Sequence, residues 1–140
     1  MPERQVQEIM THDPVTVDVA ATLVDVARRM REHDIGAVIV TEADKARGIL
    51  TDRDIVVRAV ADGRDPHQVR VQDVRSADLE TLKPQDSLDS AVEAMRRHDV
   101  RRLPVVDGEQ PVGILSIGDL AVERDPDSAL ADISAASPNR

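Results

Sequence analysis

An internal repeat constrains this chain more than any other feature. When the sequence is shifted so that Val6 aligns with Val71, the register holds without a gap as far as Asp54 and Asp119. A repeat of this length in a chain of 140 residues predicts two copies of one supersecondary unit rather than several independent domains. The aligned identities include Thr16/Thr81, Leu23/Leu88, Met30/Met95, His33/His98, Asp34/Asp99, Val40/Val105, Gly48/Gly113, Ile49/Ile114 and Leu50/Leu115.

Each unit contains one segment with the periodicity of an amphipathic helix. Apolar residues over 23–30 and 88–95 recur at i, i+3, i+4 and i+7, so they would lie on one helical face. Met30 and Met95 belong to these faces, and we expect both in the core. The pattern predicts a first helix in each unit with a side-chain cap at its start, formed by Thr22 with Asp25 and by Asp86 with Asp89.

Three short strands are expected in each unit, because their segments are extended or apolar and turns separate them. A second helix follows the third strand. It is expected to end near Gly63 in the first unit and near Pro126 in the second, since glycine and proline favour helix termination. The expected strands are 16–17, 37–40 and 48–50 in the first unit, and 81–82, 103–106 and 112–115 in the second.

The fold class that follows is mixed α/β (α+β), with two β-α-β-β-α repeats. One unit alone could not cover both faces of its small sheet, so we expect the two sheets to be apposed about a pseudo-twofold axis. The first repeat spans residues 4–62, a linker spans 63–70, the second repeat spans 71–126, and a C-terminal extension with a flexible tail spans 127–140.

Composition limits the classes of function. The net charge of −9 disfavours contact with a nucleic-acid backbone, and the absence of Phe, Tyr and Trp removes any aromatic platform for base stacking. With no cysteine, disulfides, thiol nucleophiles and thiolate metal sites are excluded. The start MPERQVQEIM lacks the apolar core of a signal peptide, and no stretch approaches a membrane span. We therefore expect a cytoplasmic protein with no nucleic-acid partner and no membrane partner.

The Gly-Ile-Leu strand of each unit runs into a hydroxyl that is followed three residues later by an aspartate, in GILTDRDI and GILSIGDL. Thr51 with Asp54, and Ser116 with Asp119, have the spacing of a capping box, which satisfies free amides at a helix start. The same groups suit a ligand, because amides and a hydroxyl donate to phosphate and a carboxylate accepts from ribose hydroxyls. Spacing alone leaves both interpretations open, and the cap is the commoner of the two.

The order of elements, with REHDIGAVIV and RRHDVRRLPVVD before the two motifs, resembles a pair of CBS domains, the cystathionine-beta-synthase motif. The resemblance covers about residues 4 to 124. The chain resembles in particular the stand-alone two-CBS proteins of bacteria, the hypoxic-response type among them. It implies a tandem Bateman module without a catalytic domain, often paired with a second copy as a disc-like homodimer. In many members of the family two clefts hold adenosine-containing ligands.

The resemblance also implies two sets of ligand-binding residues, in which the aspartate of each hydroxyl-x-x-Asp motif binds the ribose. Because no aromatic ring is present, adenine would lie between aliphatic side chains and be recognised by backbone hydrogen bonds near Thr16 and Thr81. The first-repeat set is Thr16, Val17, Gly36, Ala37, Val38, Thr51, Arg53 and Asp54, and the second-repeat set is Thr81, Leu82, Arg101, Arg102, Leu103, Pro104, Ser116 and Asp119.

The two sets differ in charge. Arg101 and Arg102 precede the second strand of the second repeat, where the first repeat has glycine and alanine. By resemblance, a basic residue at either position faces phosphates, so we expect the second-repeat set to bind polyphosphates more tightly. Arg53 stands where the second repeat has Gly118, and it would either reach an anion or lie in solvent.

Two His-Asp pairs, His33-Asp34 and His98-Asp99, repeat in register near the ends of the predicted first helices. A histidine near a helix C-terminus is favoured by the helix dipole, and duplication explains the pairing. Since further ligands are not evident at either pair, we expect no metal site.

The expected function is ligand sensing by a non-catalytic regulatory module with no required cofactor. An adenosine nucleotide or related ligand, of the AMP, ADP, ATP, NAD or S-adenosylmethionine class, would bind and change the packing of the repeats or of a homodimer. A protein partner would read that change in trans, in energy sensing or a stress response. The alternative is a ligand-free scaffold for dimerisation and protein interaction. An enzyme is least favoured, because no nucleophile with its base and no metal constellation is evident.

Overall fold

The computed structural model describes residues 4–75 and 80–124 of the chain, and these form two compact units. The first-repeat unit contains residues 15–75, and the second-repeat unit contains residues 4–14 together with 80–124. The predicted C-terminal extension, residues 127–140, lies outside the described residues. The predicted apposition of the two sheets stays a prediction.

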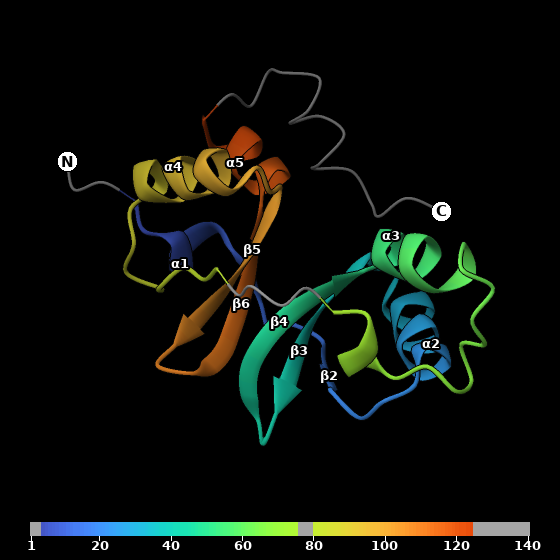
Figure 1. Cartoon of the computed structure of the whole chain (residues 1–140). Coiled ribbons are helices and arrows are strands. Elements are labelled where there is room, and N and C mark those ends of the chain that lie inside the picture. Colours follow the sequence, from blue (N-terminus) through green and yellow to red (C-terminus); the bar gives the residue numbers. More distant parts are fainter. Residues whose placement is uncertain (1–3, 76–79, 125–140) are drawn as a thin grey trace. The chain divides into compact units, whose positions relative to one another are not determined.

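The first-repeat unit is built on a three-stranded sheet of order β2-β3-β4 (Figure 1). β2 is parallel to β3, and a parallel pair needs a crossover, which helix α2 supplies between them. β3 then pairs with β4 as an antiparallel hairpin. Figure 1 shows α2 and α3 next to each other on one side of this hairpin. The bounds are β2 Thr16–Asp18, α2 Leu23–His33, β3 Ala37–Glu42, β4 Lys45–Thr51, α3 Asp52–Ile55, the π-helix η1 Val56–Val60 and the 3-10 helix η2 Val71–Asp73.

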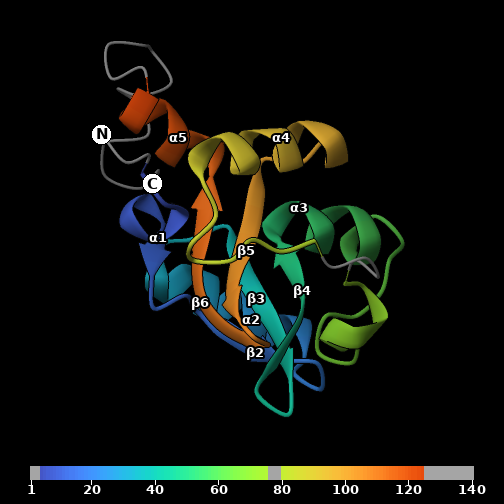
Figure 2. The same cartoon turned by 90° about the vertical axis from the view of Figure 1, so that its left-hand side faces the viewer.

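The second-repeat unit has the sheet order β1-β6-β5, in which both pairings are antiparallel. Leu82 supplies the equivalent of β2, because it forms a parallel bridge to Val105 at the same register as the Val17–Val40 pair of the first-repeat unit. Figures 1 and 2 show α4 and α5 at the end of the β5–β6 hairpin that lies away from its turn. The bounds are α1 Val6–Ile9, β1 Thr11–His12, α4 Leu88–His98, β5 Arg102–Asp107, β6 Gln110–Ser116 and α5 Ile117–Arg124.

The segments before the first strand of each repeat are exchanged between the units. Val6 packs into the second-repeat unit, where its amide donates to the Asp86 carbonyl at 2.8 Å. Val71, its equivalent, packs into the first-repeat unit, where its amide donates to the Ala21 carbonyl at 2.9 Å. Both valines are fully buried. The compact units therefore differ from the sequence repeats, and the predicted linker 63–70 contributes the buried Val69 to the first-repeat core.

The first helix of each repeat ends and begins at short polar side chains. Asp34 and Asp99 terminate α2 and α4 in the left-handed conformation, with φ of 55° and 52°. Thr22 caps α2 as predicted, and its hydroxyl accepts from the Asp25 amide at 3.3 Å. The cap predicted at Asp86 is wrong. The N-cap of α4 is Ser87, whose hydroxyl accepts from the Ser90 amide at 3.1 Å. The Asp86 carboxylate instead accepts from the Lys83 amide at 2.9 Å and closes the preceding turn.

Each unit has its own hydrophobic core of aliphatic side chains, which Met30 and Met95 enter as predicted. The second helix of the first repeat changes to π geometry after Ile55, which the periodicity did not predict. It ends before Gly63, whose φ of 70° is the glycine-favoured stop that the sequence predicted. Pro126, the predicted stop of the other second helix, lies outside the described residues.

Candidate functional site

The Thr51 motif is a closed capping box at the start of α3. The Thr51 hydroxyl accepts from the Asp54 amide at 3.1 Å, and the Thr51 amide donates to Asp54 Oδ2 at 2.9 Å. β3 brings Ala37 directly opposite Thr51, and the Asp52 amide donates to the Gly36 carbonyl at 3.0 Å. The structure thus assembles the strand, the hydroxyl and the aspartate of the first-repeat set at one junction.

The Ser116 motif has the same geometry at the start of α5. The Ser116 hydroxyl accepts from the Asp119 amide at 3.1 Å, and the Ser116 amide donates to Asp119 Oδ2 at 2.8 Å. The Ile117 amide donates to the Arg101 carbonyl at 2.8 Å, as its equivalent does in the first repeat. The capping interpretation of the hydroxyl-x-x-Asp motif is therefore confirmed in both repeats. Each box engages Oδ2 of its aspartate and leaves Oδ1 outside the box.

The Asp119 carboxyl is half-buried, and its pKa lies above the ordinary value of an aspartate. Burial penalises the charged form and is the main cause of this rise in the pKa. The hydrogen bonds from the Ser116 amide and hydroxyl act in the opposite direction, because they favour the carboxylate. The motif therefore holds an acid whose charge costs free energy in the folded state.

Arg102, rather than Arg101, lies on the same side of the sheet as the second-repeat motif. Arg102 pairs directly with Ser116 across the β5–β6 ladder, and side chains directly opposite each other project from the same face. Arg101 instead lines a surface hollow of about 440 Å³ between α4 and α5, next to Ile117 and Val100. Both arginines are exposed. The structure thus separates two positions that the sequence treated as alternatives.

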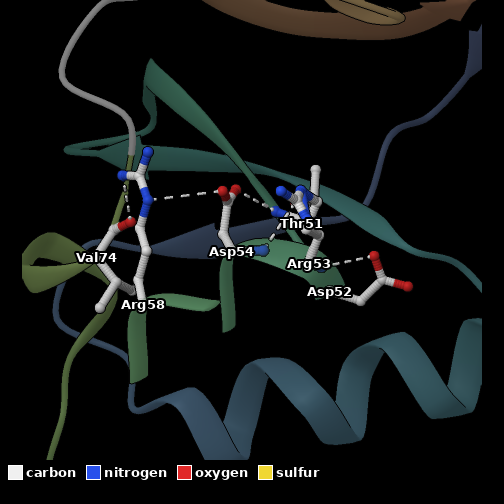
Figure 3. Close-up of polar contacts among 6 residues, drawn as sticks. All are labelled: Thr51, Asp52, Arg53, Asp54, Arg58 and Val74. Atoms are coloured by element: carbon white, nitrogen blue, oxygen red, sulfur yellow. Dashed lines mark hydrogen bonds and ion pairs between the residues drawn. The ribbon is translucent and has the colours of Figure 1, made fainter. Parts of the chain in front are cut away.

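In the first repeat, an arginine that was not predicted lies next to the motif. Figure 3 shows Arg58 between the Asp54 carboxylate and the backbone of Val74. The Arg58 Nε atom lies 3.9 Å from Asp54 Oδ1, and Nη1 donates to the Val74 carbonyl at 3.1 Å. The i, i+4 spacing of an acid and a base on a helix was the signal that would have pointed to this pair. Arg53 is exposed, and its backbone amide donates to Asp52 Oδ1 at 2.8 Å.

The aliphatic side chains of both sets are core residues. Val17 and Val38 belong to the core of the first-repeat unit, and Leu82 and Leu103 to that of the second-repeat unit. None of the four is more than 8% exposed. Their packing role is therefore established, while a contact with adenine stays a prediction. Ala37 and Pro104 are buried, Thr16 and Gly36 are partly buried, and Thr81 is exposed.

The two His-Asp pairs lie at the ends of α2 and α4. The His98 Nε2 atom lies 3.3 Å from Glu80 Oε2, and the aspartate of each His-Asp pair serves as the helix C-cap. Among residues 4–75 and 80–124, no group of three or more His, Cys, Asp or Glu side chains could hold a metal ion. Over the same residues, no helix combines the length and the apolar character that crossing a bilayer requires.

Comparison with known proteins gives a consistent family match. Residues 6–60 and 71–124 each match the CBS domain. The CBS domain-containing protein YhcV of Bacillus subtilis is 41% identical over 133 residues, which cover 92% of this chain and 94% of that protein.

Solved structures of CBS-domain proteins resemble the fold. The putative signal-transduction protein with CBS domains from Burkholderia ambifaria superposes with a TM-score of 0.80 at 30% identity, over 89% of this chain and 96% of the other. Hypoxic Response Protein I, solved with two coordinated zinc ions, gives a TM-score of 0.77 at 34% identity, over 84% and 97% of the two chains. The CBS domain pair of protein MJ0100, solved with 5′-methylthioadenosine and S-adenosyl-L-methionine, gives 0.79 at 21% identity, over 91% and 100%.

Proposed function

Because this chain belongs to the CBS domain family, we propose that it is a non-catalytic regulatory module that binds an adenosine-containing ligand through its two hydroxyl-x-x-Asp motifs. The observation that carries the proposal is the shared geometry of Thr51–Asp54 and Ser116–Asp119. In each motif one carboxylate oxygen completes the cap, and the other is free of the box to accept hydrogen bonds from ribose hydroxyls. The cap and the ligand site are then two uses of one aspartate.

The class of ligand follows from the chemistry that surrounds the motifs. A ribose binds to a carboxylate, and the arginine at position 102 supplies the bidentate donor that suits a phosphate. The complex of the MJ0100 domain pair with two adenosyl compounds supports an adenosyl group as the common part of the ligand. Adenine would then be recognised at the strand backbone near Thr16 and Thr81.

Binding of a ligand panel to the purified protein tests the proposal. The panel is AMP, ADP, ATP, NAD and S-adenosylmethionine, and the readouts are the melting temperature, calorimetry and the ultraviolet spectrum of denatured protein. Since the chain has no Trp or Tyr, a bound purine would dominate that spectrum. We expect at least one compound to bind, and Asp119→Ala to weaken its binding more than Asp54→Ala. Asp62→Ala, a change at an exposed turn, is the matched control.

Two results would overturn parts of this proposal. If no compound shifts the melting temperature and no purine is released, adenosyl sensing fails and the ligand-free scaffold becomes the better account. If Asp54→Ala and Asp119→Ala weaken binding equally, the higher affinity of the second-repeat motif is wrong. Turnover of a nucleotide by clean protein would contradict the non-catalytic role.

We also propose that the chain forms a homodimer that signals to a protein partner in trans. The observation in favour is an exposed apolar surface on η1, where Val56, Val57 and Val60 are 56%, 46% and 57% exposed. Burying these side chains against a second copy of the chain is favourable. A single exposed valine is common on protein surfaces, whereas a cluster of three indicates an interaction surface. Sedimentation of the Val57→Glu/Val60→Glu variant should show a monomer where the parent chain shows a dimer. An unchanged mass would place the dimer contact elsewhere.

A further inference from the structure

Arg58 has two contacts that tie it to the first-repeat motif. Its Nε atom lies 3.9 Å from Asp54 Oδ1, and its Nη1 atom donates to the carbonyl of Val74 at 3.1 Å. The second contact holds the guanidinium beside the carboxylate, because the carbonyl belongs to the segment that follows η2 and packs within the same unit. Figure 3 shows this arrangement, with Arg58 spanning from Asp54 to Val74.

The oxygen that Arg58 approaches is the one that a ribose would use. Asp54 Oδ2 already accepts from the Thr51 amide at 2.9 Å, so Oδ1 is the oxygen outside the capping box. The Asp54 side chain is 23% exposed and that of Arg58 is 48% exposed, so the pair is partly screened by solvent but open to a ligand. A cation at this place orients the carboxylate and offsets its charge without blocking it.

The first-repeat motif needs this cation because it contains two carboxylates. In TDRDI, Asp52 and Asp54 flank Arg53, and the Asp52 carboxylate lies against Gly36, where an added Cβ would be 3.0 Å from Oδ2. One arginine within the motif therefore faces two acids. With Arg58 the local charges balance, and without it the motif would be net negative and would repel a phosphate.

The second repeat lacks this arrangement. Its residue at the position of Arg58 is Glu123, which pairs with Arg4 at 2.8 Å. In the described part of the chain, no basic side chain forms an ion pair with Asp119. The arginine beside the aspartate is thus a property of the first-repeat motif and does not follow from the repeat itself.

We infer that Arg58 is a positioning residue of the first-repeat motif, which holds Asp54 and makes this site accept ligands that carry phosphate. The inference rests on the proposed function, because it assigns a charge preference to one of the proposed sites. Arg58 acts through Asp54 and through its own field, so its effect should depend on the charge of the ligand. A neutral nucleoside would feel little of it, and a cationic adenosyl compound would gain when the arginine is removed.

Calorimetry in an Asp119→Ala background, which leaves the first-repeat motif as the intact one, tests this. The ligands are AMP, adenosine and S-adenosylmethionine, and the variants are Arg58→Gln and Arg58→Lys. Glutamine keeps a donor for the Val74 carbonyl and removes the charge, whereas lysine keeps the charge. We expect Arg58→Gln to weaken the binding of AMP about tenfold at low salt and the binding of adenosine by less than about threefold. The binding of S-adenosylmethionine should not be weakened, and the Arg58→Lys variant should bind AMP with an affinity close to that of the parent chain. Raising the salt concentration should shrink the AMP effect.

Arg64→Gln is the matched control, because it removes the same charge at an exposed position beyond η1. It should leave all three affinities unchanged. Equal weakening of AMP, adenosine and S-adenosylmethionine by Arg58→Gln would show a structural role and overturn the inference, and so would equal effects of Arg58→Gln and Arg64→Gln. If the Asp119→Ala chain binds none of the three while the parent chain binds one, the first-repeat motif is not a site and the inference fails alone. If the parent chain binds none, the proposed function itself fails.

Discussion

Ser116 and Asp119 exchange two hydrogen bonds: the Ser116 amide donates to Asp119 Oδ2 at 2.8 Å, and the Asp119 amide donates to the Ser116 hydroxyl at 3.1 Å. The box stabilises the start of α5, but burial raises the pKa of the Asp119 carboxyl, so its negative charge destabilises the fold near neutral pH. The carboxamide of an asparagine would close the same box without burying a charge. An asparagine would suffice for the cap, whereas the ribose site proposed above uses the carboxylate.

The first prediction concerns the stability of Asp119→Asn as a function of pH. The folded state raises the pKa of Asp119, so it binds the proton more tightly than the unfolded chain does. The stability contributed by the protonated group is fully present below about pH 3.9, the ordinary pKa of an aspartate, and is lost as the pH rises through the raised pKa. Asparagine does not titrate and can still accept from the Ser116 amide. Its free energy of unfolding, relative to the parent chain, should therefore increase with pH across this window and level off above it.

Urea unfolding of both chains at several pH values between 3 and 7 provides the measurement. Other titrating groups cancel in the difference, because both chains share them. Asp119→Ala is the companion variant, and it should be less stable than Asp119→Asn at every pH because it also loses the acceptor of the capping box. A difference between Asp119→Asn and the parent chain that stays flat or falls with pH would contradict the assignment.

The second prediction concerns the hydroxyl of the first-repeat cap. Thr51→Val keeps the shape of the side chain and removes the acceptor of the Asp54 amide. It should lower the free energy of unfolding by about 0.5–2 kcal/mol, the range for loss of an N-cap. Thr51→Ser retains the acceptor and should stay close to the parent value. If the two variants unfold at the same urea concentration, the loss comes from packing and the cap contributes nothing.

Local patterns in the sequence predicted most of the elements because these patterns reflect burial within one element. The helical spacing that predicted α2 and α4 places Leu23 and Leu88 in the two cores, and the apolar runs that predicted β3 and β5 are buried along their central residues. The strands of each hairpin extend further than predicted. β4 begins at Lys45, where cross-strand backbone hydrogen bonds hold polar residues that have no apolar pattern.

The features that were missed depend on partners far apart in the chain or on precise backbone geometry. Nothing in the local pattern around Val6 or Val71 indicates which unit each will enter, because that choice is made by tertiary packing. The cap of α4 was predicted one residue too early, since Asp86 is also a favoured cap residue and the sequence does not show that its carboxylate closes a turn to Lys83. The sequence analysis did not predict a role for Arg58, although its i, i+4 spacing from Asp54 is a known helical signal.

The third prediction tests the exchange of segments between the units. Val6→Ala removes two buried methyl groups from the second-repeat core, and Val71→Ala removes two from the first-repeat core. Each should cost about 2 kcal/mol from lost burial and the cavity left behind. Hydrogen exchange should rise first in β5 and β6 for Val6→Ala, and first in β3 and β4 for Val71→Ala.

Val122→Ala is the control for this pair, because Val122 is exposed and its replacement should change the free energy of unfolding by less than about 0.5 kcal/mol. Faster exchange in β3 and β4 on Val6→Ala, with β5 and β6 unchanged, would show that each opening segment packs with its own repeat. That result would contradict the division of the chain described above.

The fourth prediction concerns Gly113 of β6, which pairs with His12 of β1. A Cβ at this position would collide with Met10 Sδ and would lie 2.8 Å from the Thr11 carbonyl oxygen. The methionine side chain could move, but the carbonyl is part of the β1–β6 ladder, in which Thr11 pairs with Ile114. Gly113→Ala should therefore displace β1 and lower the free energy of unfolding by about 1–3 kcal/mol. Adding Met10→Ala relieves the side-chain clash alone, so the double variant should not regain the stability of Met10→Ala by itself. Equal stability of Met10→Ala and the double variant would mean that the backbone contact costs nothing and that β1 is held to β6 only by the packing of Met10.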